Sequence, residues 1–373
     1  MNRIQKTIIL KDLEKKIVLI VGPRQAGKTW LAKDISTEFD NSVYLNYDQI
    51  LDREIINSQS WLPTTELLIL DELHKMKNWK NFLKGVYDTK PKSMRILVTG
   101  SARLNIYNQL GDSLAGRYFR HRLLPFSLAE IRQVGEEVKI DRLIERGSFP
   151  EPYLALDTVE AQRWRLQYIN SILSTDIFEI DKIYNVKAMQ LVFNLLRHKV
   201  GAPVSYQSLA EDVAVSPTTI KKYIQILEEL YIVFRVTPYS KNIARSLLKE
   251  PKLYFFDTGL VQGDEGAKLE NLVAVSLLKH VYGLTDYQAK EYTLHYLRTK
   301  DGVEIDFILA CQEKIESIIE VKLSDRVPTR ALVNFKERYN YPAIQLVKLL
   351  RHEFEQNEIK ILSAEKFLSK LFL

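Results

Sequence analysis

The segment KIVLIVGPRQAGKTWLAKDI, residues 16–35, constrains the fold more than any other part of the chain. An apolar run of strand length ends at Gly22, the spacing G-x-x-x-x-G-K-[ST] follows over residues 22–29, and a helical pattern begins at once. In such a loop, backbone N–H groups and a helix N-terminus surround a phosphate. The segment therefore predicts a parallel α/β sheet with a phosphate-binding loop after one of its strands.

This loop supplies the predicted nucleotide-binding residues. They are Gly22, Pro23, Arg24, Gln25, Ala26, Gly27, Lys28 and Thr29. We expect Lys28 to act as a catalytic group that reaches the β- and γ-phosphates of ATP, and the hydroxyl of Thr29 to bind Mg²⁺.

A second motif, LLILDE at residues 67–72, is an apolar strand that ends in two adjacent acids. Asp71 at its carboxyl end would lie beside Thr29 and hold Mg²⁺, directly or through water, while Glu72 would polarise the attacking water. A surface turn after a core strand is the alternative. Two such motifs in this order, each after a strand, favour the nucleotide site.

A third strand-like run, RILVTGS, ends in Thr99 and Ser101, where a polar side chain could contact the γ-phosphate. We count Ser101 among the nucleotide-binding residues, although turn chemistry explains T-G-S equally well. Arg117 in the following stretch is a candidate to neutralise transition-state charge. Solvated arginines are the preferred interpretation of Arg120 and Arg122.

Residues 160–235 have helical patterns almost throughout, and residues 205–233 predict a helix-turn-helix with Ser216 as N-cap and Pro217 in the first turn. Polar residues are expected on the outer face of its second helix: Thr218, Thr219, Lys221, Lys222 and Gln225. They could contact DNA phosphates or base edges. Such residues also occur on any solvated helix, and such modules also dock proteins, so both alternatives stand.

Acidic residues mark the carboxyl-terminal part, where residues 291–298, 303–310 and 315–323 are strand-like. With a side-chain period of two, pairing the last two runs brings Asp306, Glu320 and Lys322 to one side of a sheet. Glu270, on a preceding helix, could join them. Carboxylates that hold Mg²⁺ or Mn²⁺, with Lys322 as a catalytic group that positions water, would suit metal-dependent phosphodiester cleavage. A solvent-facing edge strand is the plain alternative.

Composition sets wider limits. Hydrophobic residues make up 46% and charged residues 27% of the 373 residues, as in ordinary globular proteins, and no apolar run approaches the length of a membrane span. A single cysteine, Cys311, excludes an internal disulfide framework and any cysteine-cluster metal site, and we expect a cytoplasmic location. The net charge of +6 is weak support for nucleic-acid binding.

Several blocks together resemble one known family. They are GPRQAGKT, LILDE, TGSARL, SLAGRYFRHRLLPFSLAE, PKLYFFDTGL and RTKDGVEIDF. They resemble, in order and over nearly the whole chain, the prokaryotic AAA-superfamily ATPases that carry a C-terminal DUF4143 domain. The resemblance implies an ATPase core, a winged-helix region and a restriction-endonuclease-like domain of the PD-(D/E)xK type.

By position, Lys28, Thr29, Asp71 and Glu72 match the nucleotide site of this family, and Arg117 matches its LAGR block. The sequence departs from the family at GSFPE (147–151), where a glycine pair is expected.

The sequence thus predicts an α/β chain of three domains: a P-loop AAA-type ATPase domain (1–150), a helical winged-helix region (151–248) and a nuclease-like DUF4143 domain (249–373). The first functional hypothesis is Mg²⁺-dependent ATP hydrolysis that controls a module directed at nucleic acid, DNA rather than RNA. The alternative is an ATP-driven switch that binds protein or DNA partners and uses an inactive nuclease fold as a scaffold. Both are compatible with a homo-oligomer, and neither involves a membrane.

Overall fold

The computed structural model describes residues 3–100, 114–135, 139–176, 185–240, 249–299, 302–312, 314–324 and 327–373. The chain forms two compact units, of which the first ends at Leu124 and the second begins at Pro125. Within the described ranges, no helix combines the length and the apolar character that crossing a bilayer requires.

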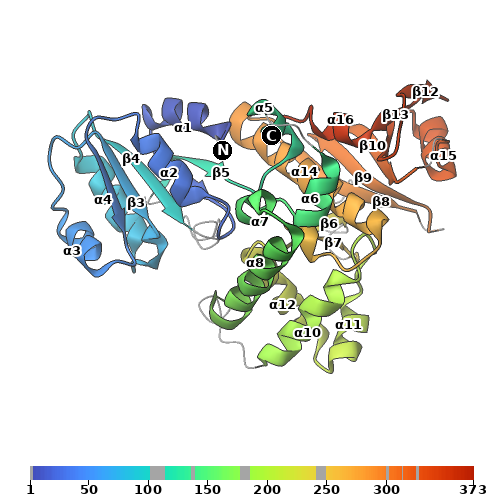
Figure 1. Cartoon of the computed structure of the whole chain (residues 1–373), viewed down its shortest axis with the longest axis horizontal. Helices are drawn as coiled ribbons and strands as arrows, with labels where there is room; N and C mark the ends of the chain where they lie inside the picture. Colours follow the sequence, from blue (N-terminus) through green and yellow to red (C-terminus); the bar gives the residue numbers. More distant parts are fainter. Residues whose placement is uncertain are drawn as a thin grey trace. The chain divides into compact units, whose positions relative to one another are not determined.

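The first unit is a parallel sheet with the strand order β2-β3-β4-β1-β5 (Figure 1). Its strands are β1 (Ile17–Val21), β2 (Ser42–Asn46), β3 (Leu67–Asp71), β4 (Arg95–Gly100) and β5 (Tyr118–Arg122). Its helices are α1 (Gln5–Leu13), α2 (Lys28–Ser36), α3 (Ile50–Ser58), the 3₁₀ turn η1 (Leu73–Lys75) and α4 (Trp79–Thr89). This confirms the predicted α/β class with a parallel sheet.

Strand β1 is buried along its whole length and sends alternate side chains to opposite faces. Val18 and Ile20 pack with side chains of α1 and α2, whereas Leu19 and Val21 pack with side chains of α3 and α4. Helices therefore cover both faces of the sheet, which explains why β1 and β3 are continuous apolar runs without polar alternation.

The second unit contains a mixed sheet with the strand order β12-β13-β11-β10-β9-β8-β6-β7. Its strands are β6 (Val233–Pro238), β7 (Lys252–Phe255), β8 (Tyr292–Arg298), β9 (Glu304–Cys311), β10 (Lys314–Lys322), β11 (Ala343–Val347), β12 (Phe354–Gln356) and β13 (Ile359–Ser363). Strands β8, β9 and β10 form an antiparallel meander. They agree with the three predicted runs to within one residue at nearly every end.

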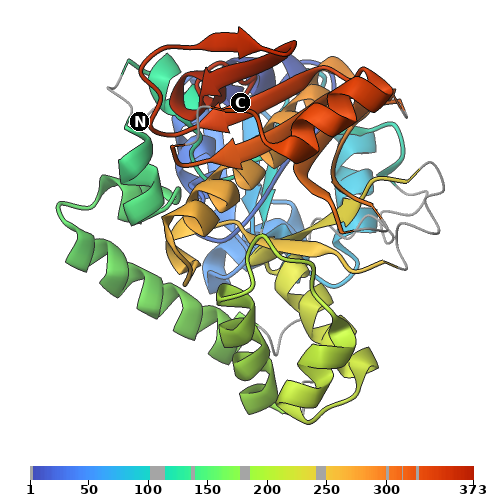
Figure 2. The same cartoon turned by 90° about the vertical axis from the view of Figure 1, so that its right-hand side faces the viewer.

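The helices of this unit precede, interrupt and follow the strands. They are α5 (Leu128–Gln133), α6 (Ile140–Arg146), α7 (Pro150–Leu154), α8 (Thr158–Ser171), η5 (Ile172–Asp176), α10 (Val186–Arg197), α11 (Tyr206–Val213), α12 (Pro217–Glu229), η6 (Thr258–Leu260), α14 (Glu265–Gln288), α15 (Arg330–Tyr339) and α16 (Ala364–Leu368). The long helix α14 packs on β7, β8 and β10, and helices α10 to α12 form a separate group of short helices (Figure 2).

The predicted helix-turn-helix is present as α11 and α12. Ser216 caps α12 by accepting a hydrogen bond from the backbone N–H of Thr219, and Pro217 is its first residue. Ile220, Ile224 and Leu227 are buried as the helical spacing predicted. The winged-helix prediction also requires a wing after α12. In the structure β6, which follows α12, pairs with both β7 and β8 in the large sheet, and residues 241–248 lie outside the described residues. The winged-helix assignment stays a prediction.

The sequence predicted three domains, whereas the structure has two compact units. Residues 125–150 belong to the second unit, and strand β6 of the middle region is part of the same sheet as β8 to β13. Strand pairing joins segments far apart in the sequence, which local patterns do not reveal.

A buried ion pair fastens α5 to α14 inside the second unit. The Lys279 ammonium lies 2.6 Å from a carboxylate oxygen of Glu130 and donates to the carbonyl of Pro125 at 2.9 Å. Glu130 is fully buried and Lys279 is 3% exposed. Two charges withdrawn from water in this way are tolerated only as a pair.

The substitution Glu130→Ala should lower the free energy of unfolding of the second unit by about 3–5 kcal/mol, because it leaves the Lys279 charge buried without its carboxylate. The double variant Glu130→Leu/Lys279→Met removes both charges and should lose much less. Urea unfolding followed by circular dichroism, analysed for two transitions, measures both. Equal losses in the two variants would contradict the role assigned to the pair.

Candidate functional site

The loop between β1 and α2 has the backbone that phosphate binding requires. Gly22 has φ 155° and lies so close to the strand end that a Cβ there would be 2.1 Å from the carbonyl oxygen of Leu123. Gly27 adopts a left-handed conformation, φ 93°, immediately before the first residue of α2. Both glycines are therefore required by backbone geometry, and the loop ends at an open helix N-terminus.

Lys28 is held inside this loop. Its ammonium donates to the carbonyl of Gly22 at 3.0 Å and to that of Pro23 at 2.6 Å, and the residue is 6% exposed. Burial lowers the pKa of Lys28 to about 8, against the opposing effect of the Glu72 and Asp71 carboxylates. A phosphate would restore the charged form, so the loop has a buried cation suited to an anionic ligand.

Asp71, at the carboxyl end of β3, is the centre of a hydrogen-bonded network. One carboxylate oxygen accepts from the Thr29 hydroxyl at 2.9 Å and from the Tyr44 hydroxyl at 2.5 Å. The other accepts from the Thr99 hydroxyl and from the backbone N–H of Glu72 at 3.0 Å. The structure thus brings together Thr29 and Asp71, the hydroxyl and the carboxylate predicted to hold Mg²⁺.

Glu72 follows in a left-handed conformation, φ 56°, which turns the chain sharply after β3. Its backbone N–H donates to the carbonyl of Thr99 at 3.1 Å, and this hydrogen bond joins the turn to the end of β4. Burial, and next the charge of Asp71, raise the pKa of the Glu72 carboxyl. A carboxylate with increased basicity, next to the metal-binding pair, is suited to accept a proton from water.

Tyr44 is part of this network but escaped the sequence analysis. The residue lies in β2 within an apolar run, where an aromatic side chain indicates only packing. Burial, followed by its hydrogen bond to Asp71, raises its pKa well above the usual value, so the hydroxyl remains a donor. Ser101, which the sequence placed at the nucleotide, lies outside the described residues.

Arg117 is not close to the loop of its own chain, and its catalytic role stays a prediction. Strands β1 and β5 are parallel with Ile17 opposite Tyr118, so Arg117 lies at the amino-terminal edge of the sheet. The loop follows Val21 at the other edge, roughly 16 Å away for five residues at about 3.3 Å each. Arg117 instead donates to Asp88 at 3.0 Å.

A second cluster of charged residues lies in the second unit, where β7, β9, β10 and α14 meet. It contains Glu270, Asp306, Glu320 and Lys322, which the sequence predicted to converge, and also Glu304. At its centre is Lys252 of β7, which is 1% exposed. The Lys252 ammonium lies 2.7 Å from Glu304, 3.3 Å from Glu270 and 3.6 Å from Asp306.

The remaining contacts hold each carboxylate in place. Asp306 accepts from the backbone N–H of Val321 at 2.9 Å, Glu270 accepts from the Tyr254 hydroxyl at 2.7 Å, and Glu320 lies 2.9 Å from the Lys322 ammonium. Burial, and next the charge of Asp306, raise the pKa of both Glu270 and Glu320 to about 7. The cluster has more buried negative charge than its two lysines offset.

The sequence predicted Asp306, Glu320 and Glu270 as metal ligands. Among the described residues, no three His, Cys, Asp or Glu side chains approach closely enough to form a metal-binding group. The physical reason is Lys252, whose ammonium occupies the space between three of the carboxylates. Sequence analysis missed Lys252 because a lysine at the start of an apolar strand is normally solvated; its only signal was a position next to Pro251 before LYFF.

Three family models match successive parts of the chain. Residues 14–132 match an AAA domain, residues 137–267 match a domain of unknown function, DUF8612, and residues 265–367 match another, DUF4143. The first match contains the loop and the Asp71 network, and the third contains most of the charged cluster.

Relatives are found in distant prokaryotes. An uncharacterized protein of Mycobacterium tuberculosis is 28% identical over 301 residues, which cover 78% of this chain and 66% of that protein. One of Haemophilus influenzae is 24% identical over 405 residues, covering 96% of this chain and 94% of the relative. Among solved structures, a Walker-type ATPase of Pyrococcus abyssi aligns with a TM-score of 0.45 and 13% identity, over 69% of this chain and 93% of that one.

The motifs, the parallel sheet and the family matches agree on the organisation of the molecule. Residues 14–132 are similar to AAA domains, and residues 265–367 are similar to DUF4143 domains.

Proposed function

We propose that the protein binds Mg·ATP at residues 22–29 and hydrolyses it. The observation that carries this proposal is the 2.9 Å hydrogen bond between Thr29 and Asp71, with Glu72 next in the chain. A hydroxyl and a carboxylate at this separation, beside a helix N-terminus, are the oxygen ligands that Mg·ATP uses in P-loop proteins.

Each side chain then has a distinct role. Lys28 exchanges its carbonyl partners for phosphate oxygens, Thr29 and Asp71 hold the metal ion, and Glu72 accepts a proton from the attacking water. Tyr44 and Thr99 keep the Asp71 carboxylate oriented toward the loop. Bound Mg²⁺ would offset the negative charge on the phosphates.

For the second unit, we propose that the charged cluster serves as a closed scaffold that responds to the nucleotide state and contacts a protein or DNA partner. Lys252 favours this role, because its ammonium is already paired with Glu270 and Asp306, two of the carboxylates that a catalytic metal would need. The outer face of α12, with Lys221 and Gln225 exposed, is a candidate surface for DNA phosphates.

A metal-dependent nuclease is the second candidate. It is supported by Glu320, a buried residue of which one carboxylate oxygen has no hydrogen-bond partner within the described part of the chain. Burying such an oxygen is costly, and a divalent cation would satisfy it. A metal could enter only if the Lys252 ammonium moved away.

Lys28→Ala should abolish ATP binding and hydrolysis, while Glu72→Gln should bind ATP normally and hydrolyse it at least about 100-fold more slowly. The reason is that Lys28 contacts phosphates in every state, whereas Glu72 acts only on the attacking water. Phosphate release and equilibrium binding of a fluorescent ATP analogue, both with Mg²⁺, measure the two effects.

Matched controls are Lys11→Ala on α1 and Glu54→Gln on α3, which are exposed residues of the same unit. Both should retain full activity. Hydrolysis that continues unchanged in Lys28→Ala or in Glu72→Gln would rule out the proposed ATPase site.

Lys252→Met should lower the melting temperature, and by more at pH 8 than at pH 5.5. The folded state raises the pKa of Glu270 and Glu320 to about 7, above an unfolded value of 4.5, so it binds more protons than the unfolded state between these limits. Stability therefore falls as pH rises through that window, and removing the ammonium steepens the fall. Thermal unfolding followed by circular dichroism at the two pH values measures it.

The control is Lys314→Met, at an exposed position of β10. Any change that it makes to the melting temperature should be the same at pH 8 and at pH 5.5. Mn²⁺ should raise the melting temperature of Lys252→Met at pH 8 and leave the wild-type protein unchanged. Nicking of supercoiled DNA by the wild-type protein with Mn²⁺, lost in Asp306→Ala and in Lys322→Ala, would instead establish the nuclease.

A further inference from the structure

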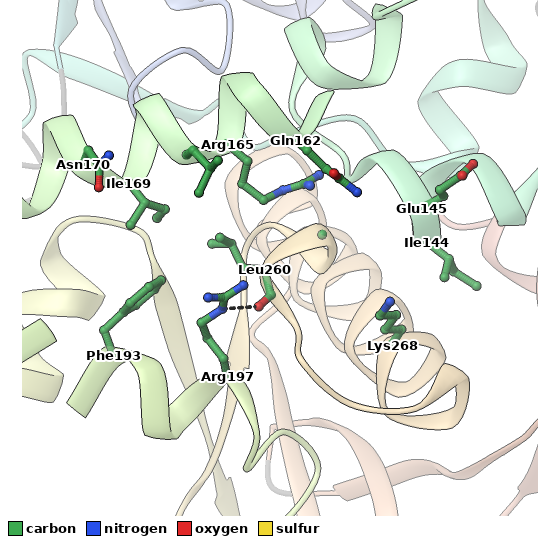
Figure 3. A pocket seen from close by; sticks show the side chains of 12 residues that line it. Ile144, Glu145, Gln162, Arg165, Ile169, Asn170, Phe193, Arg197, Leu260 and Lys268 are labelled. Atoms are coloured by element: carbon green, nitrogen blue, oxygen red, sulfur yellow. Dashed lines mark hydrogen bonds between the residues drawn. The ribbon is translucent and has the colours of Figure 1, made fainter. Parts of the chain in front are cut away.

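A pocket of about 380 Å³ lies in the second unit, and its lining includes no residue of the charged cluster. Its walls come from helices α6, α8, α10 and α14 and from the turn η6. Figure 3 shows Arg165 on α8 and Arg197 on α10 extending into the space between their helices, with Lys268 of α14 at one side. Most of the pocket lies in the region that matches DUF8612, residues 137–267.

The pocket is cationic. Arg165, Arg197 and Lys268 line it, whereas Glu145 is the single acid among its lining residues. Lys268 and Glu145 are not within ion-pair distance of each other. Arg165 is paired with Asp257, outside the lining, so the excess positive charge of the pocket is that of Arg197 and Lys268 over Glu145.

Arg165 is rigidly held at one wall. Its guanidinium donates to a carboxylate oxygen of Asp257 at 2.8 Å and to the carbonyl of Arg146 at 2.8 Å. It also lies flat against the backbone of Gly259, where a Cβ would be 2.0 Å from a guanidinium nitrogen. This arginine is 8% exposed, and its position is fixed before any ligand arrives.

Arg197 differs because its partners are neutral. Its Nε donates to the carbonyl of Leu260 at 2.7 Å. With the side-chain amide of Gln262 flipped, the amide oxygen accepts from the two terminal nitrogens of Arg197 at 2.9 and 3.1 Å. Within the described residues, no carboxylate lies within 4 Å of it. Burial, and next the charge of Arg165, lower the pKa of Arg197, which is the reverse of what an ion pair does.

The rest of the lining combines apolar side chains with two amides, Gln162 and Asn170. Leu166 and Ile169 of α8 face Phe193 of α10 and Leu260 of η6. Leu166 is 67% exposed, so it lies at the solvent-facing rim of the pocket. A pocket of this size with a few convergent polar groups on apolar walls is typical of small-molecule sites.

We propose that this pocket binds a small amphipathic anion, a molecule with one carboxylate or phosphate group at Arg197 and Arg165 and an apolar body against Leu166, Ile169 and Leu260. The guanidinium groups offer planar, paired N–H donors that match either acidic group. This site is independent of ATP hydrolysis, and it gives the middle region of the chain a ligand-binding role.

The fluorescent probe 8-anilinonaphthalene-1-sulfonate combines an anionic group with an apolar body and tests the proposal on the full chain. It should bind at one saturable site. Arg197→Gln should weaken binding about tenfold, the loss of one charge-assisted contact, and Lys268→Gln should weaken it by a smaller factor. Lys268 makes no ion pair among the described residues, so its variant should fold normally even if Arg197→Gln does not.

Two controls separate charge-dependent binding from nonspecific hydrophobic binding of the probe. Arg163→Gln removes one exposed positive charge from the same helix α8, outside the pocket, and should leave probe binding unchanged. The uncharged analogue N-phenyl-1-naphthylamine should bind equally to the wild-type protein and to Arg197→Gln. Excess Mg·ADP should not displace the probe, which separates this pocket from the nucleotide loop.

Competition identifies the ligand class. Octanoate or octyl phosphate should displace the probe, and the stronger of the two distinguishes a carboxylate from a phosphate ligand, while inorganic phosphate alone should be weaker than either. Equal probe binding in the wild-type protein, Arg197→Gln and Lys268→Gln, displacement by Mg·ADP, or displacement by an acidic peptide but by neither octyl compound would each overturn the proposal.

Discussion

The first unit depends on one carboxylate, that of Asp71. It receives hydrogen bonds from Thr29 at the start of α2, from Tyr44 in β2 and from Thr99 in β4. Side chains from one helix and two strands thus donate hydrogen bonds to the same carboxylate. Because the partners are neutral hydroxyls, the carboxylate keeps its negative charge available to a cation, at the edge where parallel α/β sheets bind ligands.

The charged cluster of the second unit follows the opposite design. There the partner of the carboxylates is an ammonium, that of Lys252, which is 1% exposed and lies within 4 Å of three acids. A buried cation of this kind takes the electrostatic role that a metal ion would otherwise have. This contrast is the reason why we propose metal binding at Asp71 and a closed scaffold at Asp306.

The sequence predicts features that depend on residues close together in the chain, and it misses features that depend on residues far apart. The phosphate-binding loop, the cap at Ser216 and the strand period around Asp306 are local patterns, and the structure has them where they were expected. Tyr44, Lys252 and the pocket around Arg197 could not be predicted, because each depends on a partner brought near by strand order or helix packing. The position of Arg117 could not be predicted for the same reason, since only the pairing of β5 with β1 shows which edge of the sheet it occupies.

Buried ion pairs also join helices α5 and α8 to the carboxyl-terminal part of the second unit. Glu130 pairs with Lys279 across 149 positions of sequence, and Arg165 pairs with Asp257 across 92. Each pair joins a helix that precedes the large sheet to an element at or beyond β7. Separating these segments would leave single charges buried, at a cost of several kcal/mol each. The helices that line the anion pocket are therefore fixed to the DUF4143 region by the same contacts that position Arg165.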